Sequence, residues 1–383
     1  MRGVADPAPV HLMGGANISR AGRRYRRAHR LRGRRGVVAV IGTLLALLVF
    51  FALFGIFLTQ YVPLWMTDNE SQFTSQAATS FAQFKEAADS QYILGGPLSV
   101  GTAFTISSQG IPLLAQPTEG TLAFLPTTCP GGFYAKGGTP TAPNSLYYGQ
   151  PITSSYCVFE NITLNYGPGA TAAAPNYYSQ HVPSGVLEMA LPNRYYSAQT
   201  FYFEDDALVQ SQGGIQQILS LPPPLTVSTV GSNTTVATSF LQLYGNASTV
   251  IGQGSEQVYS HLRYTQVVSS NGKPLNGGRS LLNMTFEIGT QYPCAWEREL
   301  NSTMNASGVP YHSGPATGTY AYPATYYNWT NPTTVNTPTL PVSASTCQSS
   351  AGGTTVLSLK ITNIDYVTVF YAGIQVAVGI GGT

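Results

Sequence analysis

The sequence predicts a mainly β protein that follows one N-terminal transmembrane helix and a short amphipathic helix. Three observations support this fold class. A 23-residue run, Val37 to Thr59, contains no ionisable side chain. Apolar residues then recur at helical spacing as far as about Ser90. From about Tyr92 onward, short β-branched and aromatic runs are bounded by Gly, Pro and Asn, which is typical of strands and turns. We expect residues 93–383 to form a sandwich-like, extracytoplasmic β domain.

Composition favours an extracellular protein over a cytosolic enzyme. Only 9% of the 383 residues are charged, while Gly (40), Pro (26) and Tyr (24) are abundant. The charge is divided unevenly: ten of the 18 basic residues, but only one of the 16 acidic residues, precede Gly36. Residues 1–36 therefore form a basic leader, and the rest of the chain is mildly acidic. The leader holds a single aromatic residue, Tyr25, so we expect no nucleic-acid partner.

The apolar run predicts a transmembrane helix over residues 37–61. A helix spanning the apolar run is roughly 35 Å long, enough to cross the hydrocarbon core of a lipid bilayer. Tyr61 and Trp65 suit the headgroup region. The arginines before the run predict a cytoplasmic N-terminus and an extracytoplasmic C-terminal domain. A conventional secretion signal is the alternative, but the run is too long and no A-x-A site follows it.

Residues 62–92 predict the amphipathic helix, or stalk. Pro63 is expected to end or kink the membrane helix. Thr67 and Glu70 have the spacing of a capping box, which predicts a new helix start there. An apolar stripe follows at spacings of three and four: Phe73, Ala77, Phe81, Phe84 and Ala88. The stripe has two interpretations, packing on the protein's own β domain, which we favour, or packing on neighbouring subunits.

The predicted strands are short runs of alternating pattern. They are PLSVGTAFTI, GTLAFL, GVLEMAL, QTFYFED, LTVSTV, SFLQLYG, SLLNMTFEIG, TVLSLKITNID and YVTVFYAGIQVAVG. The segment GGIQQILS predicts a short helical turn. The last apolar run, Tyr366 to Ile380, has only 15 residues and includes Gly373 and Gln375, so we expect a core strand there and no second membrane span.

Two segments, 127–183 and 293–353, are predicted to be irregular insertions. They are rich in Pro, Gly, Tyr, Asn, Thr and Ser and hold all four cysteines. Four cysteines allow three pairings; we favour the sequential one, which closes each insertion by a disulfide, Cys129 with Cys157 and Cys294 with Cys347. Because no two cysteines form a CxxC pair, we expect no zinc site.

Eight Asn-X-Ser/Thr sequons follow the membrane run and are candidate glycosylation sites. They begin at Asn69, Asn161, Asn233, Asn246, Asn283, Asn301, Asn305 and Asn328.

The sequence offers no support for catalysis. No G-x-S-x-G elbow, HExxH pair or phosphate-binding loop is present. Glu204, Asp205 and Asp206 form the only acidic cluster, which has two interpretations: a cation or sugar-hydrolysis site, or a solvated turn at a strand end. We favour the turn, and expect neither enzymatic activity nor a metal or cofactor.

The junction between leader and helix adds a resemblance. Arg34-Arg35-Gly36, followed directly by VVAVIG, resembles the precursors of archaeal type IV pilin-like proteins, which carry a class III signal peptide. The segments RYYSAQTFYFEDDAL and TQYPCAWEREL are similar to archaeal pilin-like surface proteins with β-rich ectodomains. The chain departs from the family pattern at Val38-Ala39, in place of Ser-Pro or Ser-Glu, and at Ile41, in place of glutamate.

The resemblance implies that a prepilin-type peptidase cuts between Gly36 and Val37 and leaves the apolar helix on the mature protein. It also implies a membrane-anchored cell-surface protein of structural or adhesive function, either a filament subunit or a minor pilin. Its partners would be identical or related subunits, bound through the N-terminal helix. The alternatives are a permanently anchored module that binds glycans or proteins and, less favoured, an anchored extracellular hydrolase.

Overall fold

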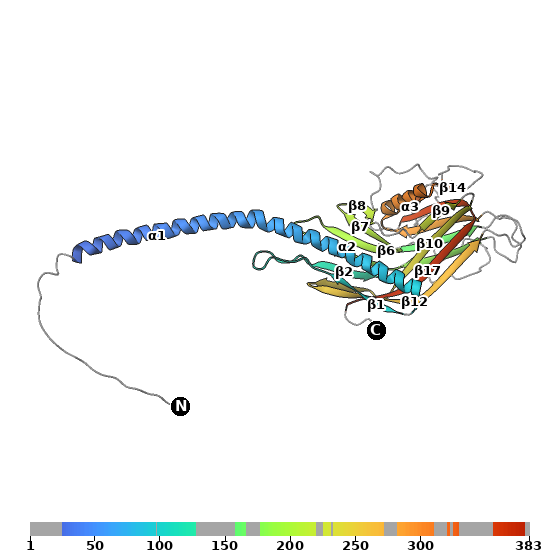
Figure 1. The fold of residues 1–383 in the computed structure, drawn as a ribbon, viewed down its shortest axis with the longest axis horizontal. Coiled ribbons are helices and arrows are strands. Elements are labelled where there is room, and N and C mark those ends of the chain that lie inside the picture. The colour runs from blue at the N-terminus through green and yellow to red at the C-terminus, as the bar shows by residue number, and fades with distance from the viewer. Residues whose placement is uncertain are drawn as a thin grey trace, which may run out of the picture. The chain divides into compact units, whose positions relative to one another are not determined.

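A computed structural model describes most of the chain. The described residues are 25–96, 98–127, 158–165, 177–219, 225–230, 233–271, 282–309, 320–321, 325–328 and 355–379. They fall into two compact units, divided between Pro63 and Leu64. The second unit holds every described strand together with most of the second helix (Figure 1).

The N-terminal helical residues follow one another without interruption. α1 (Tyr25–Ile56) passes into a π-helical turn, η1 (Phe57–Tyr61), and then into α2 (Val62–Leu94). Pro63 therefore does not end the helix, and a kink, the other form of the expectation, stays a prediction. The N–H of Val62 donates to the carbonyl of Phe57, five residues back. This π turn shifts the hydrogen-bond ladder directly before Pro63, where proline leaves a carbonyl without its amide partner.

The capping box predicted at Thr67 and Glu70 is also wrong, because both residues lie inside α2. Their side chains bond to distant parts of the chain instead. Thr67 Oγ1 donates to the carbonyl of Tyr195 at 3.4 Å, and the Glu70 carboxylate accepts four hydrogen bonds that are described below. The amides that a capping box would satisfy are already bonded within the helix.

The described strands form three sheets, so the predicted sandwich is more elaborate than two layers. The first sheet has the order β1 (Ser99–Thr105), β12 (Ser255–Asn271), β17 (Tyr366–Val378), β10 (Asn233–Tyr244), β9 (Leu225–Val230). The second has the order β11 (Ser248–Gly252), β2 (Gly120–Leu125), β5 (Val186–Leu191), β6 (Gln199–Glu204), β7 (Ala207–Gln212), β8 (Ile215–Ile218). The third has the order β14 (Tyr320–Ala321), β16 (Thr355–Ile364), β13 (Leu282–Thr290), β3 (Val158–Asn165), β4 (Tyr177–Ser184), and β15 (Thr325–Asn328) also pairs with β16.

The first sheet is shared by two hydrophobic cores. In β17, Val367, Val369 and Tyr371 belong to one core, with β13, β16 and helix α3 (Pro293–Ser307). Ala372, Ile374 and Val376 of the same strand belong to the other, with α2, β2, β5 and β6. Because successive side chains of a strand point to opposite faces, the two halves of β17 bury opposite faces of the sheet. The terminal run is thus a central core strand, as predicted.

The apolar stripe of α2 packs on the protein's own strands. Phe73, Ala77, Phe81, Phe84 and Ala88 are each at most 1% exposed. Phe81 and Phe84 meet the ring of Phe104 in β1, with centroids 5.0 and 6.5 Å away. The first interpretation of the stripe is confirmed, and these five side chains are not free to bind a neighbouring subunit. Figure 1 shows α2 beside the strands.

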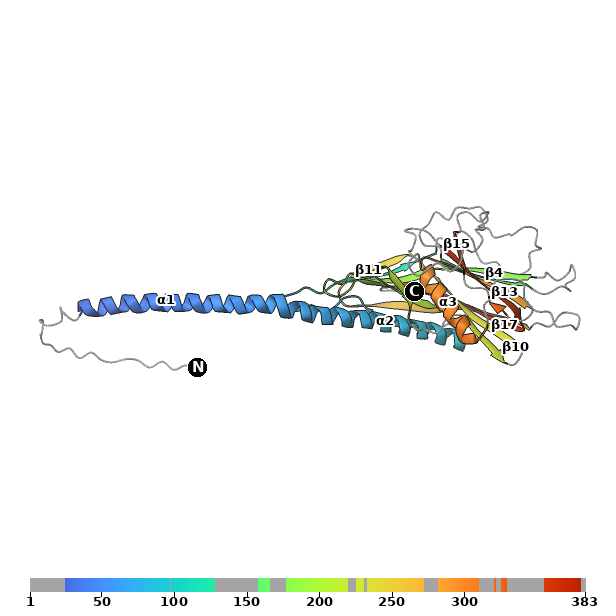
Figure 2. The same ribbon diagram turned by 90° about the horizontal axis from the view of Figure 1, so that it is seen from above.

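All nine predicted strands are present, but three segments differ from expectation. GGIQQILS forms strand β8 in place of a helical turn. Parts of both predicted irregular insertions are regular: β3 and β4 pair with each other, and α3 contacts β8, β9 and β16. Figure 2 labels β4 and α3. The reason for α3 is local, since Pro293 occupies its first turn and Gly308, at φ 71°, caps its end. The sequence pattern did not predict β12, the longest of the described strands.

Candidate functional site

The first candidate feature is the apolar half of the N-terminal helix. Large side chains from Val38 to Ile56 are exposed, among them Leu48 at 68% and Leu53 at 63%. By length and composition, Val38–Leu94 is the single helix among the described residues that could cross a membrane. A contiguous apolar surface of this size is unfavourable in water, so it needs lipid or another protein around it. Gly36 and Val37 lie within α1, and their cleavage stays a prediction.

The second feature is the Glu70 carboxylate, which binds the β5–β6 loop to α2. Its Oε2 accepts from the backbone amides of Tyr195 and Tyr196, each at 2.7 Å. Its Oε1 accepts from the amide of Arg194 at 3.0 Å and from the hydroxyl of Thr118 at 2.6 Å. Burial raises the pKa of Glu70, but these four donors lower it more, and the net shift is downward.

The third feature is a buried charged cluster at the β6–β7 turn. Asp205 and Asp206 form the turn with φ of 45° and 64°, the left-handed conformation that two-residue hairpin turns need. The predicted strand-end turn is therefore present. The prediction that it is solvated is wrong, because Glu204, Asp205 and Asp206 are 1%, 1% and 4% exposed. Glu160 of β3, also 1% exposed, completes the cluster.

Each end of the turn is held by different elements. Glu204 Oε1 accepts from the hydroxyl of Thr290 at 2.5 Å and from the indole Nε1 of Trp296 at 2.9 Å. Asp206 Oδ1 lies 2.5 Å from Nζ of Lys85, near the middle of α2, and its Oδ2 accepts from the Ser239 hydroxyl at 3.1 Å. The turn thereby joins α2, β10 and the consecutive elements β13 and α3, three parts of the chain that are remote from one another in sequence.

Burial raises the pKa of all four carboxyl groups. The pKa of Glu204 rises to about 7, despite the hydrogen bonds from Thr290 and Trp296. That of Asp206 rises to about 6, because burial outweighs the charge of Lys85. Burial, with added repulsion from neighbouring carboxylates, raises the pKa values of Glu160 and Asp205 well above normal. Glu160 Oε1, Glu204 Oε2 and Asp205 Oδ2 are buried without a hydrogen-bond partner. Low-dielectric surroundings therefore favour the neutral acids.

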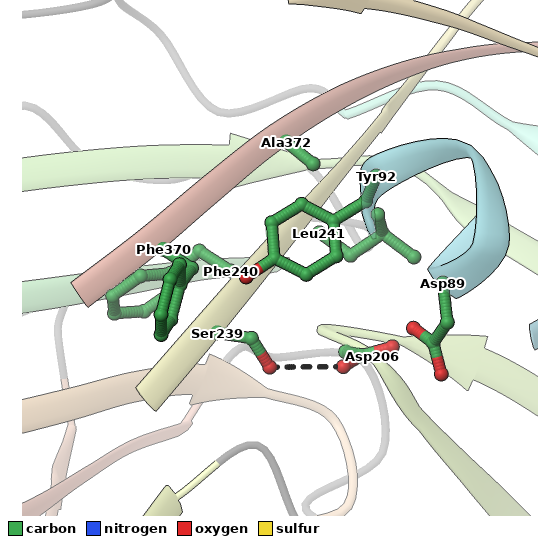
Figure 3. A pocket seen from close by; sticks show the side chains of 8 residues that line it. All are labelled: Asp89, Tyr92, Asp206, Ser239, Phe240, Leu241, Phe370 and Ala372. Atoms are coloured by element: carbon green, nitrogen blue, oxygen red, sulfur yellow. Dashed lines mark hydrogen bonds between the residues drawn. The ribbon is translucent and has the colours of Figure 1, made fainter. Parts of the chain in front are cut away.

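A small cavity of about 40 Å³ adjoins the cluster (Figure 3). Its polar lining comes from Asp89 and Tyr92 of α2, from Asp206 and from Ser239, and apolar side chains of β10 and β17 close it. The space suits one or two water molecules and is far smaller than an ordinary ligand pocket. Within the described ranges, no three His, Cys, Asp or Glu side chains are arranged to share a metal ion.

The predicted disulfides are mostly outside the described residues. Cys294, in the first turn of α3, is buried and disulfide-bonded. Cys129, Cys157 and Cys347 lie in segments that the structure does not describe, so the pairing stays a prediction.

The sequons differ in how accessible their asparagines are. Asn246, in the β10–β11 loop, and Asn305, in α3, are exposed. The amides of Asn69 and Asn161 donate to Gln109 O and Glu287 Oε2, and Asn283 Oδ1 accepts from the amide of Asn363. Asn233 and Asn301 are partly buried, and the side chain of Asn328 lies outside the description. Asn246 is the acceptor that a glycan could reach with least change.

No protein-family model, curated protein or solved structure matches this chain.

Proposed function

We propose that this chain is a pilin-like, membrane-anchored cell-surface protein with a structural or adhesive function. The observation that carries the proposal is the helix Val38–Leu94. Its first part exposes large apolar side chains continuously, while its later part is an integral core element of a β-rich unit. Such a helix can lie in a bilayer and, after release, pack its apolar surface against the same helix of other subunits.

The charge pattern supports an orientation. Arginines precede the apolar run, which favours a cytoplasmic leader and an extracytoplasmic β domain. The domain would then be oxidised and open to glycosylation, in keeping with the bonded Cys294 and the exposed Asn246. We include in the proposal the pairings of Cys129 with Cys157 and of Cys294 with Cys347.

The decisive experiment is N-terminal sequencing of the protein isolated from its native membrane. We expect a mature chain that begins at Val37, and loss of this cut in Gly36→Asp. The matched control is Gly42→Ala, six residues further along the helix, where an added Cβ meets no atom within 4 Å. Its processing should be normal. A surface-exposed population that retains residues 1–36 would refute the processing step.

A second experiment separates the two forms of the proposal. Electron microscopy of sheared cell surfaces should show filaments that contain this chain if it polymerises. A processed chain that stays in the membrane without filaments would instead favour the alternative, a permanently anchored binding module. For the orientation, both cysteine variants are made in the Gly36→Asp chain, which keeps its leader. An impermeant thiol reagent should then label Asn246→Cys on whole cells, but not Gly3→Cys.

The acidic cluster does not support the hydrolase alternative. That alternative needs the cluster at Glu204, Asp205 and Asp206 to line an open, concave site, but these side chains are buried and the adjoining cavity holds about 40 Å³. A sugar ring requires a much larger pocket.

A further inference from the structure

Lys85 and Asp206 form a close and deeply buried ion pair. Nζ lies 2.5 Å from Oδ1, and the side chains are only 4% and 6% exposed. The second carboxylate near Nζ, that of Asp89, is more distant, at 3.4 Å, and 39% exposed. An ion pair that is so deeply buried has lost its hydration, and moving one proton from Nζ to Oδ1 converts it into a neutral amine and a neutral carboxylic acid. A desolvated, neutral lysine amine is a nucleophile.

We propose that Lys85 and Asp206 condense to an intramolecular isopeptide bond, which fastens α2 covalently to the β6–β7 turn. Nζ attacks Cγ of Asp206, so that an Nζ–Cγ bond forms and the Cγ–Oδ1 bond breaks. Oδ1 leaves as water with the proton first received from Nζ and a second proton. The amine contributes two protons in all, the product is a neutral amide, and no oxidant or other reactant is consumed.

Neighbouring groups supply what the step needs. Ser239 donates to Oδ2, the oxygen that becomes the amide carbonyl (Figure 3). The other oxygen, Oδ1, is the one that contacts Lys85. Asp89 can pass the second proton: its Oδ2 lies 3.4 Å from Nζ, so this carboxylate takes a proton from Nζ, gives it to the departing oxygen and ends as it began.

The cavity beside Asp206 offers a place for the departing water. Its volume of about 40 Å³ exceeds what one water molecule needs, and Asp89, Tyr92 and Ser239 provide polar partners. Folding itself holds the amine and the carboxyl together. Well-oriented intramolecular reactions reach effective molarities on the order of 10⁵–10⁸ M, which favours a condensation that is slow between free molecules.

The bond would have a mechanical consequence. Lys85 and Asp206 are 121 positions apart, and the first lies on the helix that leads to the apolar segment. A pull along the N-terminal helix would reach the β-rich unit through a covalent bond as well as through packed side chains. Formation of the Lys85–Asp206 bond does not depend on cleavage after Gly36. An experiment can therefore refute the bond without refuting the proposed function, and the reverse is also true.

The test is mass spectrometry of the full-length folded protein after reduction and digestion behind lysine and arginine. We expect a branched peptide that joins the segment holding Lys85 to the segment holding Asp206. It should be lighter than the two segments together by one water molecule. Lys85→Arg is the matched variant, because a guanidinium keeps the charge but is not a comparable nucleophile. It should yield no branched peptide.

Asp89→Asn separates chemistry from folding. An asparagine preserves shape but cannot relay a proton, so freshly folded protein should accumulate the branched peptide at least tenfold more slowly than wild type. The proposal is overturned if wild-type protein with a cooperative melting transition yields Lys85 and Asp206 only in separate, unmodified peptides. In that case the contact is an ordinary buried ion pair.

Discussion

The indole Nε1 of Trp296 donates a 2.9 Å hydrogen bond to Oε1 of Glu204. Trp296 is fully buried in the first turns of α3, and Glu204 ends β6. The bond therefore joins α3 to the second sheet. The strands that flank α3 in sequence, β13 and β14, belong to the third sheet. The stability of the β-rich unit should therefore depend on whether the Glu204 carboxyl group is protonated.

Stability should fall as the pH rises from about 4.5 to about 7. Glu204 has an ordinary pKa of 4.5 and a folded-state value of about 7, so the folded chain binds the extra proton in this window. The contribution is complete below pH 4.5 and is lost as pH rises through 7, on the order of 3 kcal/mol. Asp206, shifted from 3.8 to about 6, has the same sign in chains in which it is not bonded covalently to Lys85. Urea unfolding of the full chain at pH 5 and pH 8 measures the difference.

Glu204→Gln should reduce this pH dependence. The amide oxygen of glutamine can still accept from Trp296, but the side chain no longer ionises. The variant should be closer to equal stability at pH 5 and pH 8 than wild type. An unchanged difference between the two pH values would assign the effect to other groups.

Glu70→Gln should destabilise the β-rich unit by roughly 2–4 kcal/mol. The substitution turns one carboxylate oxygen into an amide nitrogen that faces the backbone N–H groups of Tyr195 and Tyr196 or of Arg194. It therefore leaves partly buried donors unpaired. Thermal or urea unfolding measures the loss. Asp68→Asn is the control: this residue lies on the exposed side of the same helix, so its effect should stay within about 0.5 kcal/mol. Equal losses would show that the contacts of Glu70 are unimportant.

Phe81→Ala should cost about 3–5 kcal/mol, because it removes a fully buried ring that contacts Phe104 and Phe201. The control on the same helix is Ile93→Ala, where the side chain is 76% exposed. Its effect on the unfolding midpoint should be small. If both variants unfold alike, α2 is not a core element of the unit.

Gly373→Ala should destabilise the chain by about 1–3 kcal/mol through overpacking. The ring of Tyr264, on the paired strand β12, lies directly over Gly373, at a point where the strand register shifts by one residue. An added methyl group would collide with this ring. Gly96→Ala, whose new methyl group would find its nearest neighbour 3.9 Å away, is the control. A fully stable Gly373→Ala protein would mean that Tyr264 moves aside freely.

Local pattern alone predicted much of the fold. The apolar run predicts the N-terminal helix that contains Val38. The spacing from Phe73 to Ala88 predicts a buried stripe on a helix, and period-two alternation predicts nine strands. These features follow from residues near one another in sequence, and hydrophobic periodicity is a local signal. Helix α3, which was not predicted, also has a local signal in its sequence. Its buried residues Trp296, Leu300 and Met304 recur every four positions between Pro293 and Gly308.

Other features had weak or misleading local signals. Strand β12 alternates poorly, because much of its outer face is polar or exposed and a register shift follows Leu262. Thr67 and Glu70 fit a capping box in sequence, but a helix already continues through them and their partners are more than 40 residues away.

The sequence by itself determined the leader, the apolar helix and the β-rich character of the rest, because charge and hydrophobic periodicity act over a few residues. Only the tertiary structure decided the environment of FYFEDDALV. Three consecutive acidic residues predict a solvated turn, since isolated charges avoid burial. Packing against α2, β3, β10 and α3 instead encloses them, with Lys85, Ser239 and Trp296 as partners from 121, 33 and 92 positions away. Burial depends on contacts between distant segments, and no local pattern specifies which segments will meet.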